Sequence, residues 1–201
     1  MLTNLNVRKT GRGVVLAALL AGAAVLALAG GVAGFFRDPV RPWRTDPDIL
    51  YSPADGFVIG VDQVEGAWHV ERPAHRISIF LSLFDVHVNR SPASGTIIAA
   101  RDLGSGFFPA MDFRRSHDNR RRELAYQTGR GPLLVVQVAG LLARRIVPWV
   151  EPGQAVAAGQ KLGMITFGSR TDLIIPIDAA EPLVGSGRRV IGGQTGIARW
   201  R

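Results

Sequence analysis

The sequence predicts a mainly β domain preceded by one N-terminal transmembrane helix. Three features lead to this prediction: a long uncharged run at residues 13–36, short Val- and Ile-rich runs between Gly and Pro, and two internal sequence repeats. About 20 consecutive apolar residues cross a bilayer as a helix, whereas short β-branched runs between turn signals are typical of strands. The 201 residues leave room for one ordinary domain and an appendage.

The uncharged run reads GVVLAALLAGAAVLALAGGVAGFF over residues 13–36. Basic residues flank it on both sides, so the positive-inside rule gives no orientation. A cleaved signal peptide is the alternative, because Ala27-Leu28-Ala29 forms an A-x-A site. The apolar run continues for seven residues beyond Ala29, which a signal peptide does not need. We therefore expect residues 1–36 to be a membrane anchor.

A linker and a β-rich domain are expected after the anchor. Residues 37–50 hold three prolines and alternating charges, which predicts an extended linker. Residues 51–201 form the predicted domain, and the polar block at 111–125 is expected to be a solvated helix or a long loop. Strands are expected at the apolar runs 57–61, 77–84, 96–100, 133–138, 164–167 and 173–177.

Two repeats indicate related β units within this domain. SPADGFVI recurs as SPASGTII between residues 52 and 98, and GQAVAAGQ recurs as GRRVIGGQ between residues 153 and 194. The V-x-x-G-Q turns of the second pair resemble those of biotinyl and lipoyl carrier domains. This resemblance implies a barrel-sandwich-like β domain.

The composition limits the chemistry that is possible. With 24 Lys plus Arg against 16 Asp plus Glu, the formal charge is +8, which favours an anionic phospholipid surface or a nucleic acid as partner. No aromatic-plus-basic motif supports RNA binding. The chain has no cysteine, which excludes disulfides, thiolate metal sites and cysteine nucleophiles. Lys9 and Lys161 are the only lysines for chemistry that needs one.

The histidines do not have the spacing of a metal site. They occur at positions 69, 75, 87 and 117, without the close pairs that metal motifs contain. His87 alternates with Asp85 and Asn89 in FDVHVN, which predicts the polar face of a strand. On this pattern alone, His87 is either a surface residue or a functional one.

Two turn-like positions are open to similar double interpretations. Asp55 is either an Asx-turn residue or a functional carboxylate. Gly168-Ser169 interrupts an otherwise strand-like stretch. It is either a tight turn between two strands or a reactive peptide bond, since glycine marks a close backbone approach.

Six segments carry a family resemblance, in the same order along the chain. They are FFRDPVR (35–41), SPADGFV (52–58), ISIFLSLFDVHVNRSPASG (77–95), HDNRR (117–121), VQVAGLLARRIV (136–147) and GQKLGMITFGSRTDLIIP (159–176). Together they resemble the phosphatidylserine decarboxylase family, in its short, archaeal-type branch.

The resemblance implies a proenzyme that cleaves itself between Gly168 and Ser169, into fragments 1–168 and 169–201. Ser169 attacks the Gly168 carbonyl, with His87 as the base and Asp55 as the carboxylate that fixes its tautomer. Elimination of the resulting ester turns residue 169 into a pyruvoyl group. The ketone of this group condenses with the substrate amine and accepts the electrons released with carbon dioxide, as pyridoxal phosphate does elsewhere.

The implied function is a lyase of phospholipid biosynthesis that converts phosphatidylserine to phosphatidylethanolamine. The implied partners are an anionic membrane and the two cleavage fragments, which form a heterodimer; neither nucleic acid, a metal nor pyridoxal phosphate is expected. The implied location is the cell inner membrane, with the catalytic domain in the cytoplasm.

Arg90 is the main departure from the longer members of the family, which carry a second histidine at this position. That histidine shares the work of self-cleavage and decarboxylation, so the assignment of both tasks to His87 stays open. Arg90 is instead a candidate to bind the substrate carboxylate or phosphate.

Two other functions are compatible with parts of the sequence. A non-enzymatic, membrane-tethered carrier or adaptor of the biotinyl/lipoyl type would present Lys161 as its modified residue. A membrane-tethered metallopeptidase would need a His and Asp ligand spacing that the sequence does not contain.

Overall fold

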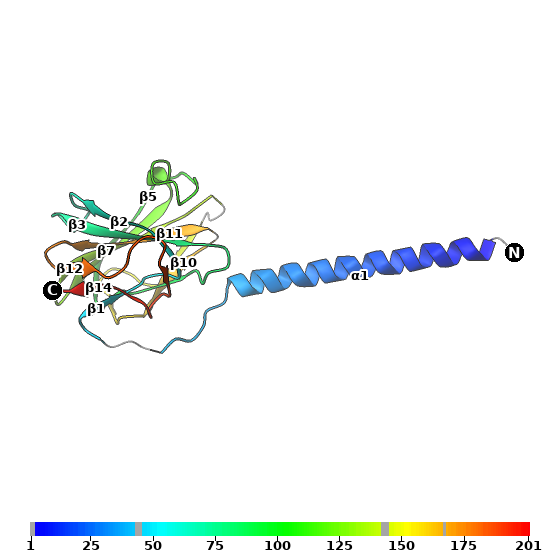
Figure 1. Cartoon of the computed structure of the whole chain (residues 1–201), viewed down its shortest axis with the longest axis horizontal. Coiled ribbons are helices and arrows are strands. Elements are labelled where there is room, and N and C mark those ends of the chain that lie inside the picture. Colours follow the sequence, from blue (N-terminus) through cyan, green and yellow to red (C-terminus); the bar gives the residue numbers. More distant parts are fainter. Residues whose placement is uncertain (1–2, 43–45, 142–144, 167) are drawn as a thin grey trace. The chain divides into compact units, whose positions relative to one another are not determined.

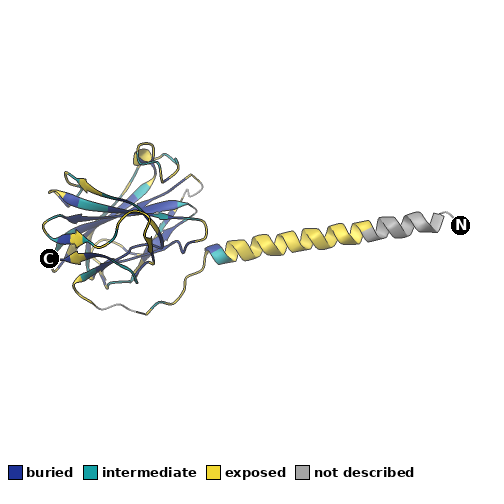
Figure 2. Cartoon of the chain, viewed as in Figure 1, coloured by how far each residue is buried: buried dark blue, intermediate teal, exposed yellow. Residues whose placement is uncertain are grey.

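The computed structural model describes residues 3–42, 46–141, 145–166 and 168–201. The chain divides between Arg37 and Asp38 into two compact units. The first unit is a single helix, α1 (Thr3–Phe35), of which Gly13–Phe35 is long and apolar enough to cross a membrane. Its side chains are exposed from residue 13 to residue 33 (Figure 2). A helix that is apolar on all sides is stable in an apolar solvent, as the predicted anchor requires.

The second unit is built mainly from short strands (Figure 1). Every ladder between its named strands is antiparallel. The strands are β1 (Ile49–Tyr51), β2 (Gly56–Val64), β3 (Ala74–Leu81), β4 (Val88–Arg90), β5 (Gly95–Leu103), β6 (Arg121–Thr128), β7 (Gly131–Val138), β8 (Ile146–Pro148), β9 (Ala155–Val156), β10 (Lys161–Ile165), β11 (Ser169–Pro176), β12 (Ala180–Pro182), β13 (Arg189–Val190) and β14 (Gly196–Trp200). One 3-10 turn, η1 (Ser116–Asp118), lies between β5 and β6.

These strands form three sheets. The largest is a curled half-barrel with the strand order β13-β2-β3-β11-β7-β6-β5-β9. The two smaller sheets have the orders β1-β14-β12 and β4-β10-β8. The prediction of a mainly β domain after one apolar helix is therefore confirmed.

The main hydrophobic core joins the large sheet to the two smaller ones. It includes Leu50 from β1, Ile79 from β3, Leu162 from β10 and Leu173 from β11, all fully buried. Strand β11 is buried along its whole length, because β3 and β7 pair with its two sides. The residue at its start, Ser169, is therefore held by a central strand.

The polar block that was expected to be a helix or a loop ends inside strand β6, so this prediction is wrong for its last five residues, 121–125. Its charges are neutralised across the β5–β6 ladder. Glu123 accepts from Arg101 at 2.8 Å, and Arg122 donates to Asp102 at 2.7 Å. Pairing with a neighbouring strand lets charged residues occupy a strand that a charge run alone does not predict.

The two sequence repeats form equivalent hydrogen-bonded units. Ser52, in the first repeat, accepts a bond on its carbonyl from Gly193 N–H at 2.8 Å. Ser91, in the second, accepts the corresponding bond from Gly159 N–H, also at 2.8 Å. Each S-P-A turn thus pairs with one V-x-x-G-Q turn, and the repeated sequence corresponds to repeated backbone structure.

The two repeats differ at one position. In the first repeat, Gly192 N–H donates to the Asp55 carboxylate at 2.8 Å. In the second repeat, Ala158 N–H donates to the Ser94 hydroxyl at 3.1 Å. Asp55 therefore places a negative charge where the related turn has a neutral hydroxyl.

Candidate active site

Ser169 lies at one end of the central strand β11, where several loops meet. It is the first residue of β11 and pairs with Leu81, the last residue of β3. The next residue, Arg170, pairs with Val138, the last residue of β7. In an antiparallel sheet, the ends of the two neighbouring strands lie beside the start of the central one. The loops that follow β3 and β7 therefore flank the Gly168–Ser169 bond.

The Gly168–Ser169 bond combines an unusual backbone with a buried hydroxyl. Gly168 has a φ of +63°, a conformation that costs a residue with a side chain about 1–2 kcal/mol. Ser169 is fully buried, and its Oγ has no hydrogen-bond partner among the described residues. A buried, unsatisfied polar atom is unfavourable for stability alone. This hydroxyl is therefore a candidate for a role other than stability.

Gly140, in the loop after β7, packs against the Gly168 carbonyl group. A methyl group at position 140 would lie 1.7 Å from the Gly168 oxygen and 2.9 Å from the Gly168 carbon. Only glycine permits such an approach. The contact fixes the position of the carbonyl that Ser169 would attack.

Asn119 holds the segment that leads to Gly140. Its Nδ2 donates to the Ala139 carbonyl at 2.7 Å and to the Phe108 carbonyl at 2.8 Å. Its Oδ1 accepts from Phe108 N–H at 2.8 Å. Because Asn119 is fully buried, these bonds tie the end of β7 firmly to the loop after β5.

His87 lies in the interior, far from Ser169 in the sequence but bonded to strand β10, which precedes the Gly168–Ser169 bond. It is fully buried, and its carbonyl accepts from Ile165 N–H at 3.2 Å, near the end of β10. Its Nδ1 lies 2.9 Å from the Asp85 carbonyl oxygen. If Nδ1–H donates to this carbonyl, Nε2 carries the lone pair and is able to accept a proton.

The expected alternation around His87 is wrong. Phe84 is 85% exposed and Asp85 only 1% exposed, the reverse of the prediction. The segment is a turn after β3, because Asp85 Oδ2 accepts from both Ser82 N–H at 2.8 Å and Ser82 Oγ at 2.6 Å. Arg189 donates to the other Asp85 oxygen at 2.8 Å and balances the buried charge.

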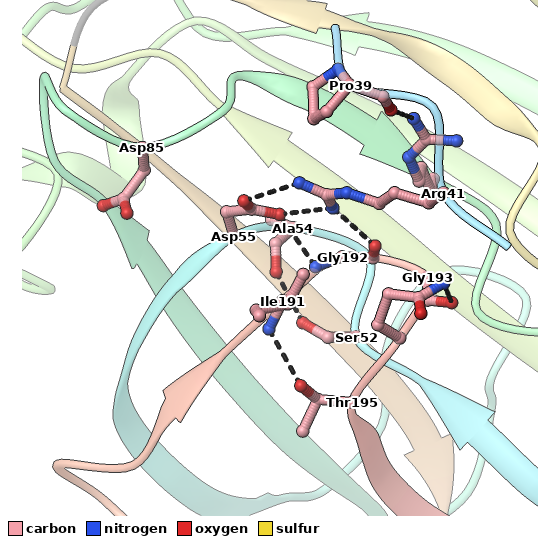
Figure 3. Close-up of polar contacts among 12 residues, drawn as sticks. Pro39, Arg41, Ser52, Ala54, Asp55, Asp85, Ile191, Gly192, Gly193 and Thr195 are labelled. Carbon is pink, nitrogen blue, oxygen red and sulfur yellow. Dashed lines mark hydrogen bonds and ion pairs between the residues drawn. The ribbon is translucent and has the colours of Figure 1, made fainter.

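Asp55 forms a largely buried ion pair with Arg41 (Figure 3). Arg41 Nη1 donates to Asp55 Oδ1 at 2.6 Å, and Nη2 donates to Oδ2 at 2.7 Å. Arg41 also donates to the Gly192 carbonyl at 2.6 Å. Figure 3 shows Asp85 well apart from this pair. Both oxygens of the predicted orienting carboxylate thus have Arg41 as a partner.

Arg90 binds the segment that contains Arg41. Its Nη2 donates to Asp38 Oδ1 at 3.0 Å and to the Pro39 carbonyl at 3.3 Å. Burial and the positive charge of Arg41 lower the pKa of Arg90, while Asp38 and Asp55 act in the opposite direction. Arg90 remains a cation at neutral pH, because the pKa of a free guanidinium lies far above 7.

Residues 38–42, here called the strap, belong to the expected linker but are bonded to the β unit. Asp38 pairs with Lys161 as well as with Arg90, and Gln194 donates to the Pro42 carbonyl at 2.6 Å. A cavity of about 180 Å³ lies between the strap and these side chains. Lys161, the residue that a carrier function would modify, begins β10 and lines this cavity.

Within the described part of the chain, no group of three or more His, Asp or Glu side chains is arranged to hold a metal ion. The family model for phosphatidylserine decarboxylase matches residues 28–198. This match extends from the end of α1 to β14 and includes every site residue described above. The chain belongs to the phosphatidylserine decarboxylase family.

Two curated proteins illustrate the relationship. The phosphatidylserine decarboxylase proenzyme of Carboxydothermus hydrogenoformans is 44% identical over 165 residues, which cover 82% of this chain and 78% of that protein. The phosphatidylserine decarboxylase proenzyme of Symbiobacterium thermophilum is 45% identical over 179 residues, which cover 89% of this chain and 83% of that protein.

The structure relates the candidate residues of this phosphatidylserine decarboxylase family member in two groups. His87 is linked through Ile165 to the strand that leads to Ser169. Asp55 and Arg90 instead share the strap. Sequence reasoning named all four residues and missed three others that hold the site together: Arg41, Asn119 and Gly140. Each lies in a segment that resembles the phosphatidylserine decarboxylase family, which was the only signal available for them.

Proposed function

We propose that the chain decarboxylates phosphatidylserine to phosphatidylethanolamine with a pyruvoyl group formed from Ser169. The observation that carries this proposal is the Gly168–Ser169 bond, with its left-handed glycine, its buried hydroxyl and the close contact of Gly140. The names of both relatives support it, since they are phosphatidylserine decarboxylase proenzymes, and a proenzyme is a precursor.

Self-cleavage begins when Ser169 Oγ bonds to the Gly168 carbonyl carbon and the bond to the Ser169 nitrogen breaks. The Oγ proton passes to His87 Nε2 and from there to the departing amine. Loss of the Ser169 Cα proton then breaks the Cβ–O bond and leaves a carboxylate on Gly168. Water replaces the nitrogen of the unsaturated residue 169, and ammonia leaves.

The surroundings of residue 169 fit a pyruvoyl group. The β11 ladder to β3 and β7 holds the new chain end on both sides, which keeps its position fixed for reaction. When formed, the group supplies a ketone that accepts electrons during decarboxylation. His87 is the proposed proton donor to the product, because it lies beside the strand that leads to residue 169.

Asp55 is proposed to orient His87 during self-cleavage. Because Arg41 occupies both Asp55 oxygens, a bond to His87 requires one oxygen to exchange its partner. The Asp85 carbonyl already fixes one imidazole nitrogen. In the structure, His87 contacts the Asp85 carbonyl. The proposed contact between His87 and Asp55 would form only during self-cleavage.

Arg90 is proposed to bind the carboxylate or phosphate of the substrate. In the structure, the Asp38 carboxylate is bonded to Arg90 and to Lys161. A substrate anion has the same charge and the same acceptor atoms as this carboxylate. On binding, the substrate anion would replace the Asp38 carboxylate as the partner of Arg90.

The arrangement in the cell follows from the same proposal. Helix α1 anchors the chain in the cell inner membrane, an anionic surface, and the β unit lies on the cytoplasmic side, where phospholipids are made. Fragments 1–168 and 169–201 stay together as a heterodimer, because β11 and β14 of the smaller one pair with strands of the larger. The paired S-P-A and V-x-x-G-Q turns support a barrel-sandwich relationship to biotinyl and lipoyl domains.

Intact-mass measurement of the purified chain tests the proposal. We expect one fragment that ends at Gly168 and one that spans 169–201 with a blocked N-terminus, together with release of carbon dioxide from phosphatidylserine. An uncut chain that retains a seryl residue at 169 and still releases carbon dioxide contradicts the pyruvoyl mechanism. An uncut, inactive chain with a modified Lys161 supports the carrier function instead.

A further inference from the structure

A cavity of about 400 Å³ opens beside the proposed cleavage site, and Gly168 forms part of its wall. The rest comes from Phe80 in β3 and from the three loops that follow β3, β5 and β7. Most of the lining residues are apolar, including Phe80, Pro109 and Ala110. The cavity therefore offers few partners to a charged head group and many contacts to hydrocarbon.

Four large apolar side chains on these loops are exposed, and we call them the apolar rim. They are Leu83 and Phe84 after β3, Met111 after β5 and Leu141 after β7, with exposed fractions of 45%, 85%, 56% and 57%. Exposed apolar residues are common singly, but a contiguous group around one cavity marks an interaction site. The apolar rim is formed by three loops that are separate in the sequence, so it is a feature of the folded domain and not of one amphipathic segment.

Basic residues accompany the apolar rim in two of its three loops. Arg114 and Arg115 are exposed in the loop that carries Met111, and Arg145 is exposed shortly after Leu141. Apolar side chains beside exposed arginines match a surface with a hydrocarbon interior and negative head groups. A second copy of this chain, with its own excess of positive charge, is a poorer match to these arginines.

We propose that the apolar rim enters an anionic phospholipid bilayer, so that the cavity beside Gly168 opens directly to the lipid. This inference rests on the proposed function, in which a diacyl lipid must bring its head group to residue 169. Withdrawal of both acyl chains from the bilayer is costly in proportion to their length. Contact between the rim and the bilayer lets the chains stay in hydrocarbon while the head group reaches the site.

Site-directed fluorescence quenching on the full chain tests the contact, because the chain has no native cysteine. Single variants Phe84→Cys and Leu141→Cys carry an environment-sensitive dye, in nanodiscs whose anionic lipid is phosphatidylglycerol. Leu183→Cys is the matched control, since Leu183 is also an exposed leucine, at 43%, but follows β12 in another sheet. Nitroxide groups on the lipid acyl chains should quench the dye at 84 and 141 at least fivefold more than at 183.

Equal quenching at all three positions, or none at 84 and 141, overturns the proposal. The proposal is also overturned if the labels at 84 and 141 respond only to contact between chains. Such contact is recognised by a signal that depends on the number of chains per nanodisc. The same labels on a Ser169→Ala chain should show the same stronger quenching at 84 and 141. Because that chain has no decarboxylase activity, the membrane contact is tested even if the proposed function fails.

A kinetic comparison provides a second readout. Phe84→Ser should lower the ratio of the rate on phosphatidylserine in nanodiscs to the rate on a short-chain, dispersed phosphatidylserine, by about tenfold or more. Leu183→Ser should leave this ratio unchanged. A Phe84→Ser ratio equal to that of the wild type overturns the rim proposal while the decarboxylase function stands. Absence of carbon dioxide release from either lipid by the wild-type chain contradicts the function itself.

Discussion

Gly140 is in contact with the carbonyl group of Gly168, the group that Ser169 is proposed to attack. The two glycines lie in separate segments beside the ends of the central strands β7 and β11, 28 positions apart in the sequence. No side chain fits between them, since even a methyl group on Gly140 would overlap the Gly168 oxygen. Backbone packing, rather than a hydrogen bond from a side chain, therefore sets where this carbonyl lies.

Gly140→Ala should slow self-cleavage by about 100-fold or more, because an ångström-scale displacement of a reacting group has an effect of that size. The accumulation of uncut chain on a denaturing gel, followed over days, measures it. Gly129→Ala is the matched control, since a methyl group there meets nothing within 4 Å. If both variants mature at the rate of the wild type, the Gly140 contact has no role in cleavage.

Ser169→Ala should give an uncut, inactive chain that folds normally. The Ser169 hydroxyl has no hydrogen-bond partner among the described residues, so its removal leaves no new unsatisfied group. Thermal unfolding in detergent should therefore occur no lower than for another uncut variant, such as His87→Gln. A markedly lower unfolding temperature for Ser169→Ala would show that the hydroxyl is structural.

His87→Gln should reduce the rate of self-cleavage by roughly 10²- to 10⁴-fold, the usual contribution of a positioned base. The amide keeps a polar group in the buried site but is a far weaker base than imidazole. His117→Gln serves as the control, because the His117 side chain is 71% exposed. Time courses of fragment formation compare the two, and normal maturation of His87→Gln would remove His87 from the mechanism.

Arg41→Met should lower the free energy of unfolding by about 3 kcal/mol, because it leaves the Asp55 carboxylate buried without its ion-pair partner. The side chains of Arg41 and Asp55 are only 10% and 11% exposed. Arg72→Met breaks an ion pair with Asp178 whose side chains are 44% and 64% exposed, and it should cost less than about 1 kcal/mol. Denaturant unfolding in a Ser169→Ala background measures both on an uncut chain, and equal effects would contradict a tightly bound strap.

Sequence patterns predicted the strands best where both faces of a strand are buried. The run that became β7, GPLLVVQV, is apolar along most of its length, and a continuous apolar run of this length indicates a buried strand. Strand β6 was not predicted, because its charged residues look like a solvated segment. In the structure, Arg122 and Glu123 are paired with β5 residues about 20 positions earlier. A local charge pattern carries no information about partners at that distance.

The candidate residues Ser169 and His87 were named from the family resemblance, because the local sequence gave each of them a structural interpretation as well. Their roles stay predictions. Arg41 and Gly140 were not named, because their roles depend on which segments fold against each other. An arginine before a proline looks the same in the sequence whether or not it pairs with a carboxylate. A glycine in an apolar run likewise looks the same whether or not it packs against a carbonyl.

The position of residue 169 on a strand bonded along both edges has a consequence for the working life of the catalyst. The proposed pyruvoyl group at this place would not dissociate and would not be replenished from solution. Any side reaction that destroyed it would inactivate that molecule permanently, so the cell would have to restore activity by synthesis of new chains rather than by supply of a vitamin.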